Sequence, residues 1–165
     1  MPVRRARPED AAAIAEVHVR TWQVAYEHVF GAEKLATLDP ERRREWWERS
    51  IRAGLEPVFV AESAGRIVAF ANVGASQDAD AGGQLYAIYA LPEAWGTGVG
   101  HELMAACLGA LRDAGHGDAI LYVLEDNPRA RRFYEREGWA LDGGTKTDEF
   151  LGVPVPEVRY RIRLD

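Results

Sequence analysis

Apolar residues recur along the chain with two different periods, and each change of period predicts an element. Residues 3–6 form a first predicted strand. Residues 8–10 then begin a helix, because the apolar positions Ile14, Val17 and Trp22 follow at helical spacing. The amino-terminal third is therefore predicted to be mainly helical.

Strands are predicted to dominate the middle of the chain. A second helix begins at residues 39–40, where an Asp-Pro pair favours a helix start. Residues 58–61 and 67–73 are expected to form a hairpin around a short turn. Residues 75–83 are polar and contain glycine, which is typical of a loop.

The second half alternates strands and helices. A strand at residues 84–91 leads through a glycine-rich segment into a helix that ends near Ala114. A strand at 119–124, a short helix at 129–137 and two closing strands follow. In the last strand Val158, Tyr160, Ile162 and Leu164 alternate with three arginines, so we expect one buried and one solvated face. The order predicts one α/β domain over residues 1–165, with helices on both sides of a single sheet.

The composition is that of a folded globular protein, with 47% apolar and 28% charged residues. No apolar run approaches the length that spans a bilayer, and the first ten residues lack the apolar core of a signal peptide. We therefore expect a cytoplasmic protein with no membrane partner. The net charge of −6 and the interleaving of arginines with acidic residues argue against a nucleic-acid partner.

Cysteine and histidine usage excludes two kinds of chemistry. Cys107 is the only cysteine, so no intramolecular disulfide can form. It shares a helical stripe with Leu103 and Leu108, and we expect a packed core thiol rather than a nucleophile. The four histidines show no metal-ligand spacing, so no metal is expected.

Three glycines at alternate positions, Gly96, Gly98 and Gly100, stand directly before a predicted helix. Glycines there let the backbone approach an anion, and the helix start offers unpaired N–H groups. The spacing fits neither the dinucleotide fingerprint nor a P-loop, and the two lysines, Lys34 and Lys146, lie far away in sequence. The segment is either a phosphate cradle or a tight strand-to-helix turn.

A second motif follows about one helix and one strand later. Asn127 is a good N-cap and Pro128 suits the first helical position, so the start of a helix is enough to explain both residues. Arginines 129, 131, 132 and 136 come next, interleaved with Glu135 and Glu137. This cluster is either a solvated helix face or a contact for phosphates.

Together the two segments resemble the GNAT superfamily of acyl-CoA-dependent N-acyltransferases, which carry a (Gln or Arg)xxGxG loop and later NxxAxxxYxxxGF. The matching positions are Trp95, Gly96, Thr97, Gly98, Val99 and Gly100, then Asn127, Ala130, Tyr134, Gly138 and Trp139. The resemblance extends loosely over most of the chain. It implies a mixed, mostly antiparallel twisted sheet of six to seven strands, with a splayed central strand pair that binds coenzyme A.

The resemblance also implies a reaction and a site. Acetyl-CoA would be the cosubstrate, and a primary amine would attack its thioester directly. Tyr134 would protonate the departing thiolate, and Tyr89 would point away from the strand edge that binds pantetheine. The implied cosubstrate-binding residues are Ile88, Ala90, Gly96, Thr97, Gly98, Val99, Gly100, His101 and Asn127.

Two departures from the family pattern affect the site. Trp95 replaces the usual Gln or Arg, although the backbone donors of the loop remain. Gln84 and Tyr122 occupy positions where some members carry a catalytic Glu. The identity of the general base therefore stays open. The candidates are Tyr122 acting through a water, Glu27 or His28 in a lid at residues 25–35, and Glu125; the reaction could also proceed without a dedicated base.

Other functions of the fold, and the identity of the acceptor, also stay open. The same fold could serve as an acyl-CoA-binding regulatory module, and the glycine loop could instead bind a nucleotide. A purely structural protein would leave the two spaced motifs without a purpose. The sequence does not choose between a small-molecule amine and a peptide or protein amine, and a homodimer is a general expectation only.

Overall fold

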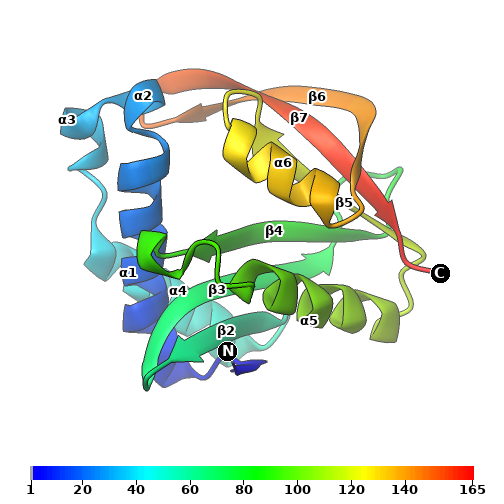
Figure 1. Ribbon diagram of the computed structural model, residues 1–165, viewed down its shortest axis with the longest axis horizontal. Helices are drawn as coiled ribbons and strands as arrows, with labels where there is room; N and C mark the ends of the chain where they lie inside the picture. Colours follow the sequence, from blue (N-terminus) through cyan, green and yellow to red (C-terminus); the bar gives the residue numbers. More distant parts are fainter. Residues whose placement is uncertain (1) are drawn as a thin grey trace.

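A seven-stranded sheet in the order β1-β2-β3-β4-β5-β7-β6 organises the computed structural model, which describes residues 2–165 (Figure 1). Neighbouring strands are antiparallel except β4 and β5, which run parallel. The prediction of a mixed, mostly antiparallel sheet is confirmed. The strands are β1 (Val3–Arg5), β2 (Val58–Ser63), β3 (Arg66–Ala75), β4 (Gly83–Ala90), β5 (Asp118–Leu124), β6 (Ala140–Phe150) and β7 (Val153–Arg163).

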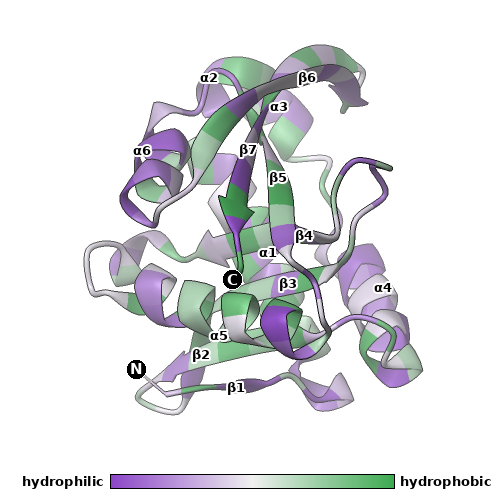
Figure 2. Ribbon diagram, turned by 90° about the vertical axis from the view of Figure 1, so that its right-hand side faces the viewer, coloured by the Kyte–Doolittle hydropathy of each residue, from purple (hydrophilic) through white to green (hydrophobic). Residues whose placement is uncertain are grey.

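Helices cover both faces of the sheet, as predicted. The α1 and α4 helices lie on one face, and α5 and α6 lie on the other (Figure 2). The helical elements are η1 (Pro8–Asp10), α1 (Ala11–Ala25), α2 (Glu27–Phe30), α3 (Ala32–Leu35), α4 (Pro40–Ala53), η2 (Pro92–Ala94), α5 (Val99–Asp113) and α6 (Pro128–Arg136). Among residues 2–165, none of them has the length and apolar character needed to cross a membrane.

Local sequence signals set the ends of these helices. The Asp39 side chain accepts a hydrogen bond from the Glu41 N–H at the start of α4, and Gly54 ends that helix with a φ of 65°. Asn127 caps α6 by accepting from the Ala130 N–H at 3.2 Å. These caps satisfy backbone groups that would otherwise lack partners.

Two apolar clusters hold the layers together. The larger one joins the sheet to α1, α4 and α5 and contains the fully buried Cys107, as predicted for a core thiol; burial raises its pKa to about 12. The smaller one lies beneath residues 25–35. Its buried members are Trp22, Tyr26, Phe30, Leu35, Leu124 and Val155. The predicted lid is therefore packed against the end of the sheet by its own aromatic side chains.

The parallel pair β4 and β5 separates soon after it begins. Only Gly83 with Ala119 and Gln84 with Ile120 are paired between them. From Leu85 onward the β5-facing edge of β4 has no partner strand within the described chain. The splayed central strand pair implied by the family resemblance is present, and it opens a gap in the middle of the sheet.

The expectation that the arginine face of β7 is solvated holds only at its carboxyl-terminal end, where the Arg163 side chain is 83% exposed. The Arg159 side chain is only 12% exposed, because Asp78, Asp80 and Asp142 form ion pairs with it. The loop after β3 supplies two of these carboxylates and covers the middle of this face, around Arg159 and Arg161. At the other end of the same face Glu157 is buried, at 6% exposure.

Candidate active site

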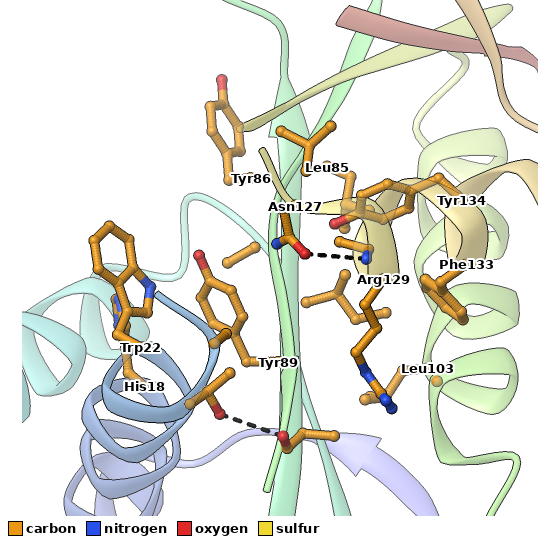
Figure 3. A pocket seen from close by; sticks show the side chains of 18 of the residues that line it. His18, Trp22, Leu85, Tyr86, Tyr89, Leu103, Asn127, Arg129, Phe133 and Tyr134 are labelled. Atoms are coloured by element: carbon orange, nitrogen blue, oxygen red, sulfur yellow. Dashed lines mark hydrogen bonds between the residues drawn. The ribbon is translucent and has the colours of Figure 1, made fainter. Parts of the chain in front are cut away.

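A cavity of about 940 Å³ lies where β4 and β5 separate. Its walls come from α1, β4, the glycine loop with α5, and α6, and β7 closes one side. His18 and Trp22 approach from α1, Phe133 and Tyr134 approach from α6, and Asn127 lies between them (Figure 3). The cavity is thus built from segments that are distant in sequence.

The glycine loop forms one end of this cavity. Gly98 is the N-cap of α5 and has a φ of 85°, a conformation that favours glycine. A Cβ atom on Gly100 would lie 2.9 Å from the Phe133 ring, so a side chain there would collide with α6. The first-turn N–H groups of α5 have no intrahelical partners and can bind an anion.

The predicted loop residues do not all face the cavity. Gly96, Gly98, Val99, Gly100 and His101 line it. Thr97 does not belong to this lining, because its Oγ1 donates a 2.5 Å hydrogen bond to the Ala94 carbonyl and shapes the turn. The His101 Nδ1 lies 2.9 Å from Glu137 Oε1.

Three arginines of α6 stand beside the loop. Arg129, Arg132 and Arg136 line the cavity, and none of them has an ion-pair partner among residues 2–165. Burial lowers the pKa of Arg129, and the charges of Arg136 and Arg132 lower it further. Arg131 differs, because it donates to Tyr160 Oη and the Glu125 carbonyl. Three arginines of α6 without ion-pair partners, close to the start of α5, favour a ligand with several phosphates.

The predicted pantetheine edge of β4 also faces the cavity. Ile88 and Ala90 both line it. The Ala90 carbonyl already accepts hydrogen bonds from Thr21 Oγ1 at 3.3 Å and from Trp95 Nε1 at 2.9 Å. Tyr89 points toward α1, where its ring centroid lies 5.3 Å from that of His18, yet it lines the same cavity because the cavity continues beneath α1.

Tyrosine hydroxyls gather at the centre of the cavity. Burial raises the pKa of Tyr134 well above its ordinary value, and nearby Tyr89 adds to this rise. Burial likewise raises the pKa of Tyr26, with further contributions from Tyr89 and Tyr134. Asn127 Nδ2 donates a 3.0 Å hydrogen bond to the Tyr26 hydroxyl, so the helix cap also orients this cluster. All three tyrosines stay protonated near neutral pH.

Most of the base candidates from the sequence lie elsewhere. Gln84 is buried, but its Oε1 accepts from Ser76 and Gln77 in the loop after β3. Glu27, His28 and Glu125 are outside the cavity lining. Tyr122 lines the cavity and donates a 2.5 Å hydrogen bond to Asp78. Burial raises the pKa of Tyr122, and the bond to Asp78 raises it further.

Sequence reasoning missed three groups that the structure brings together. Tyr26, between α1 and α2, Tyr89 of β4 and Glu157 of β7 all line the cavity. The signal for Tyr26 was its place in the lid segment. No local signal distinguished Glu157, because its strand partners Leu124 and Lys146 come from β5 and β6 and the cavity it lines is built from several distant elements.

The fold and much of the sequence are similar to those of known N-acyltransferases. The N-acetyltransferase YuaI of Bacillus subtilis, itself uncharacterized, is 35% identical over 130 residues, covering 76% of this chain and 73% of that protein. The L-amino acid N-acyltransferase MnaT of Escherichia coli is 27% identical, covering 100% and 97%. The PaiA N-acetyltransferase of Thermoplasma acidophilum, solved in complex with coenzyme A, superposes with a TM-score of 0.79 at 17% identity, covering 98% of both chains.

These similarities define the class as acyl-group transferases. Residues 12–139 match the acetyltransferase (GNAT) family, and the chain belongs to that family.

Proposed function

We propose that this protein transfers the acetyl group of acetyl-CoA to the nitrogen of a primary amine. The observation that carries the proposal is the single cavity that joins the glycine loop and the α6 arginines to the buried tyrosine cluster. One end suits a diphosphate, and the other is a largely apolar chamber for an acceptor. Family membership and the coenzyme A complex of a protein with the same fold support this assignment.

Acetyl-CoA would lie along the gap between β4 and β5. Its diphosphate would meet the first-turn N–H groups of α5, with Arg129 close by. Its pantetheine amides would pair with the open edge of β4 near Ile88 and Ala90. Because the Ala90 carbonyl is already occupied by Thr21 and Trp95, its N–H would be the available group there.

The amine nitrogen would form a bond to the thioester carbonyl carbon, and the carbon–sulfur bond would then break. Backbone N–H groups near Ile88 would stabilise the negative charge that develops on the carbonyl oxygen. Tyr134 keeps its proton because burial raises its pKa, so it can donate a hydrogen bond and then a proton to the leaving thiolate. The amine loses its proton to a base.

The acceptor end combines aromatic walls with one free cation. Trp22, Trp46 and Phe150 line it, and so does Arg43, whose guanidinium has no hydrogen bond or ion pair within the described residues. A cation there favours an amine that also carries an anionic group. The name of the relative MnaT makes L-amino acids the first acceptors to test.

Two measurements test the proposal. In a thermal-shift screen, acetyl-CoA at about a hundred times its Kd should stabilise the fold by roughly 2.7 kcal/mol, whereas ATP and NAD should not. Release of free coenzyme A thiol is then followed with L-amino acids, polyamines and a short peptide. Stabilisation without thiol release would favour the acyl-CoA-binding regulatory module. No stabilisation by acetyl-CoA would overturn the proposed function.

A further inference from the structure

We propose that Glu157 is the catalytic base that removes the proton from the acceptor amine. The inference rests on the proposed function and supplies the group that the sequence motifs leave unassigned. It starts from a buried carboxylate on β7 that lines the cavity. No helix cap or turn in the fold uses this side chain.

One oxygen of this carboxylate lacks a partner. Glu157 Oε1 is buried and accepts no hydrogen bond from any residue in 2–165. The Nζ of Lys146, on the neighbouring strand, is 4.0 Å away, which is beyond hydrogen-bond distance. A buried acceptor without a donor is costly, and native structures rarely keep one without a purpose. An acceptor ammonium group would supply the missing donor.

Glu157 belongs to the same cluster as the proposed acid. Its charge contributes to the raised pKa of Tyr26 and of Tyr89, after the larger effect of burial on each. The Tyr89 hydroxyl in turn acts on Tyr134. The hydroxyl of Tyr26 is therefore within electrostatic range of both the proposed acid, Tyr134, and the proposed base, Glu157.

The surroundings tune the carboxyl group for this task. Burial raises the pKa of Glu157 to about 7, and a shared hydrogen bond with Asp148 also raises it, while the charge of Lys146 lowers it. The other titratable groups facing it are Tyr26, at the junction of α1 and α2, and Tyr89 from β4. A base whose pKa is near the working pH is partly ionised and still binds a proton well.

The other cavity groups that could accept a proton are less suited. Burial lowers the pKa of His18 to about 3, so its imidazole would release a proton rather than keep it. Tyr122 would have to ionise first, and its hydroxyl is bound to Asp78. Glu137 and His101 also line the cavity, but they pair with each other at the glycine-loop end. Glu157 is then the one remaining carboxylate among the lining residues.

The proton balance is complete without a further reactant. The ammonium proton passes to Glu157 Oε1, and the neutral amine attacks the thioester carbon. Tyr134 gives its proton to the sulfur. Glu157 then loses this proton to solvent between turnovers, since its pKa is about 7. As the carbon–sulfur bond breaks, the acylated nitrogen loses its second proton, which restores Tyr134 through solvent, and the enzyme returns to its starting state.

The first experiment compares Glu157→Gln with Glu149→Gln, a matched change at an exposed site on β6. With the best L-amino acid from the thiol-release panel, Glu157→Gln should lower kcat by about 100-fold or more and leave the Kd of acetyl-CoA within about twofold. The acid limb of kcat/KM near pH 7 should also disappear. Glu149→Gln should match the wild type. Undiminished turnover in Glu157→Gln would overturn the inference while leaving the proposed function intact.

Two neighbouring variants give opposite shifts that a merely structural Glu157 would not produce. Asp148→Asn removes an interaction that raises the Glu157 pKa, so the acid limb should move to lower pH by about half a unit or more. Lys146→Met removes a cation, so the limb should move to higher pH. An unmoved limb in both variants would overturn the inference even if Glu157→Gln failed to bind acetyl-CoA. A wild-type protein without thiol release would overturn the proposed function and this inference with it.

Discussion

The guanidinium carbon of Arg129 lies 3.7 Å from the centroid of the Trp95 ring. Trp95 stands at the loop position where the family pattern has Gln or Arg, so the tryptophan does not simply remove a polar group. Instead it holds an arginine from α6 over the loop, while its Nε1 is fixed by the Ala90 carbonyl at 2.9 Å. A cation is thus supplied to the phosphate end from a different element.

Trp95→Ala should therefore weaken acetyl-CoA binding. Loss of the cation–π contact, worth about 1 kcal/mol, and of the positioning of Arg129 should raise the Kd roughly fivefold to tenfold. Turnover at saturating acetyl-CoA should change little, because the side chain of Trp95 contacts Ala90 and Arg129 and makes no hydrogen bond to a tyrosine hydroxyl within the described residues. Isothermal calorimetry and saturation kinetics measure the two effects. Arg129→Lys keeps the charge but loses the planar stack, and it should lie between wild type and Trp95→Ala.

Gly98→Glu should abolish acetyl-CoA binding. The φ of 85° at Gly98 disfavours any side chain, and a carboxylate at the N-terminus of α5 would repel the diphosphate. The control is Gly109→Glu, in the middle of α5, where a Cβ meets nothing within 4 Å and no positive φ is required. Calorimetry that gave Gly98→Glu a normal affinity would show that the diphosphate lies elsewhere.

The features predictable from sequence are those set by local signals. The alternating glycines before α5 and the Asn127–Pro128 start of α6 depend on neighbours a few residues away, and both lie where the sequence placed them. The splayed strand pair followed from the family resemblance, because no local pattern states where β4 leaves β5.

The base candidate was missed because its burial depends on distant segments. The alternation of Val158, Tyr160 and Ile162 assigns Glu157 to the arginine face of β7. We expected this face to be exposed to solvent. That face is covered at one end by the lid aromatics and in its middle by the loop that carries Asp78. A period-two pattern reports which residues share a face, but not what covers that face.

Tyr134→Phe should lower kcat by roughly a hundredfold or more while the Kd of acetyl-CoA stays nearly unchanged. The ring is buried, so phenylalanine keeps the packing and removes only the hydroxyl. The control is Tyr160→Phe, whose ring centroid lies 6.1 Å from that of Tyr134 and whose hydroxyl donates to Glu135 outside the cavity. Stopped-flow detection of thiol release separates the two, and equal rates for both variants would remove Tyr134 from the mechanism.

Glu157→Gln should stabilise the fold above pH 7, which is the cost that a buried catalytic carboxylate imposes on the wild type. The unfolded pKa of Glu is about 4.3, and burial raises the folded pKa of Glu157 to about 7. Between these values the folded state keeps a proton that the unfolded state has lost, so the wild-type free energy of unfolding falls as the pH rises through this window. Glutamine cannot ionise and avoids this fall.

Urea denaturation should therefore show Glu157→Gln to be more stable than wild type by about 3.5 kcal/mol at pH 8, with the difference shrinking toward zero near pH 4. Glu149→Gln, which changes an exposed carboxylate, should show no such pH-dependent gain. If Glu157→Gln were equally or less stable than wild type at pH 8, the carboxylate would be well solvated or firmly paired in the folded state. That result would disprove a raised pKa for Glu157, and it would do so without any knowledge of the acceptor amine.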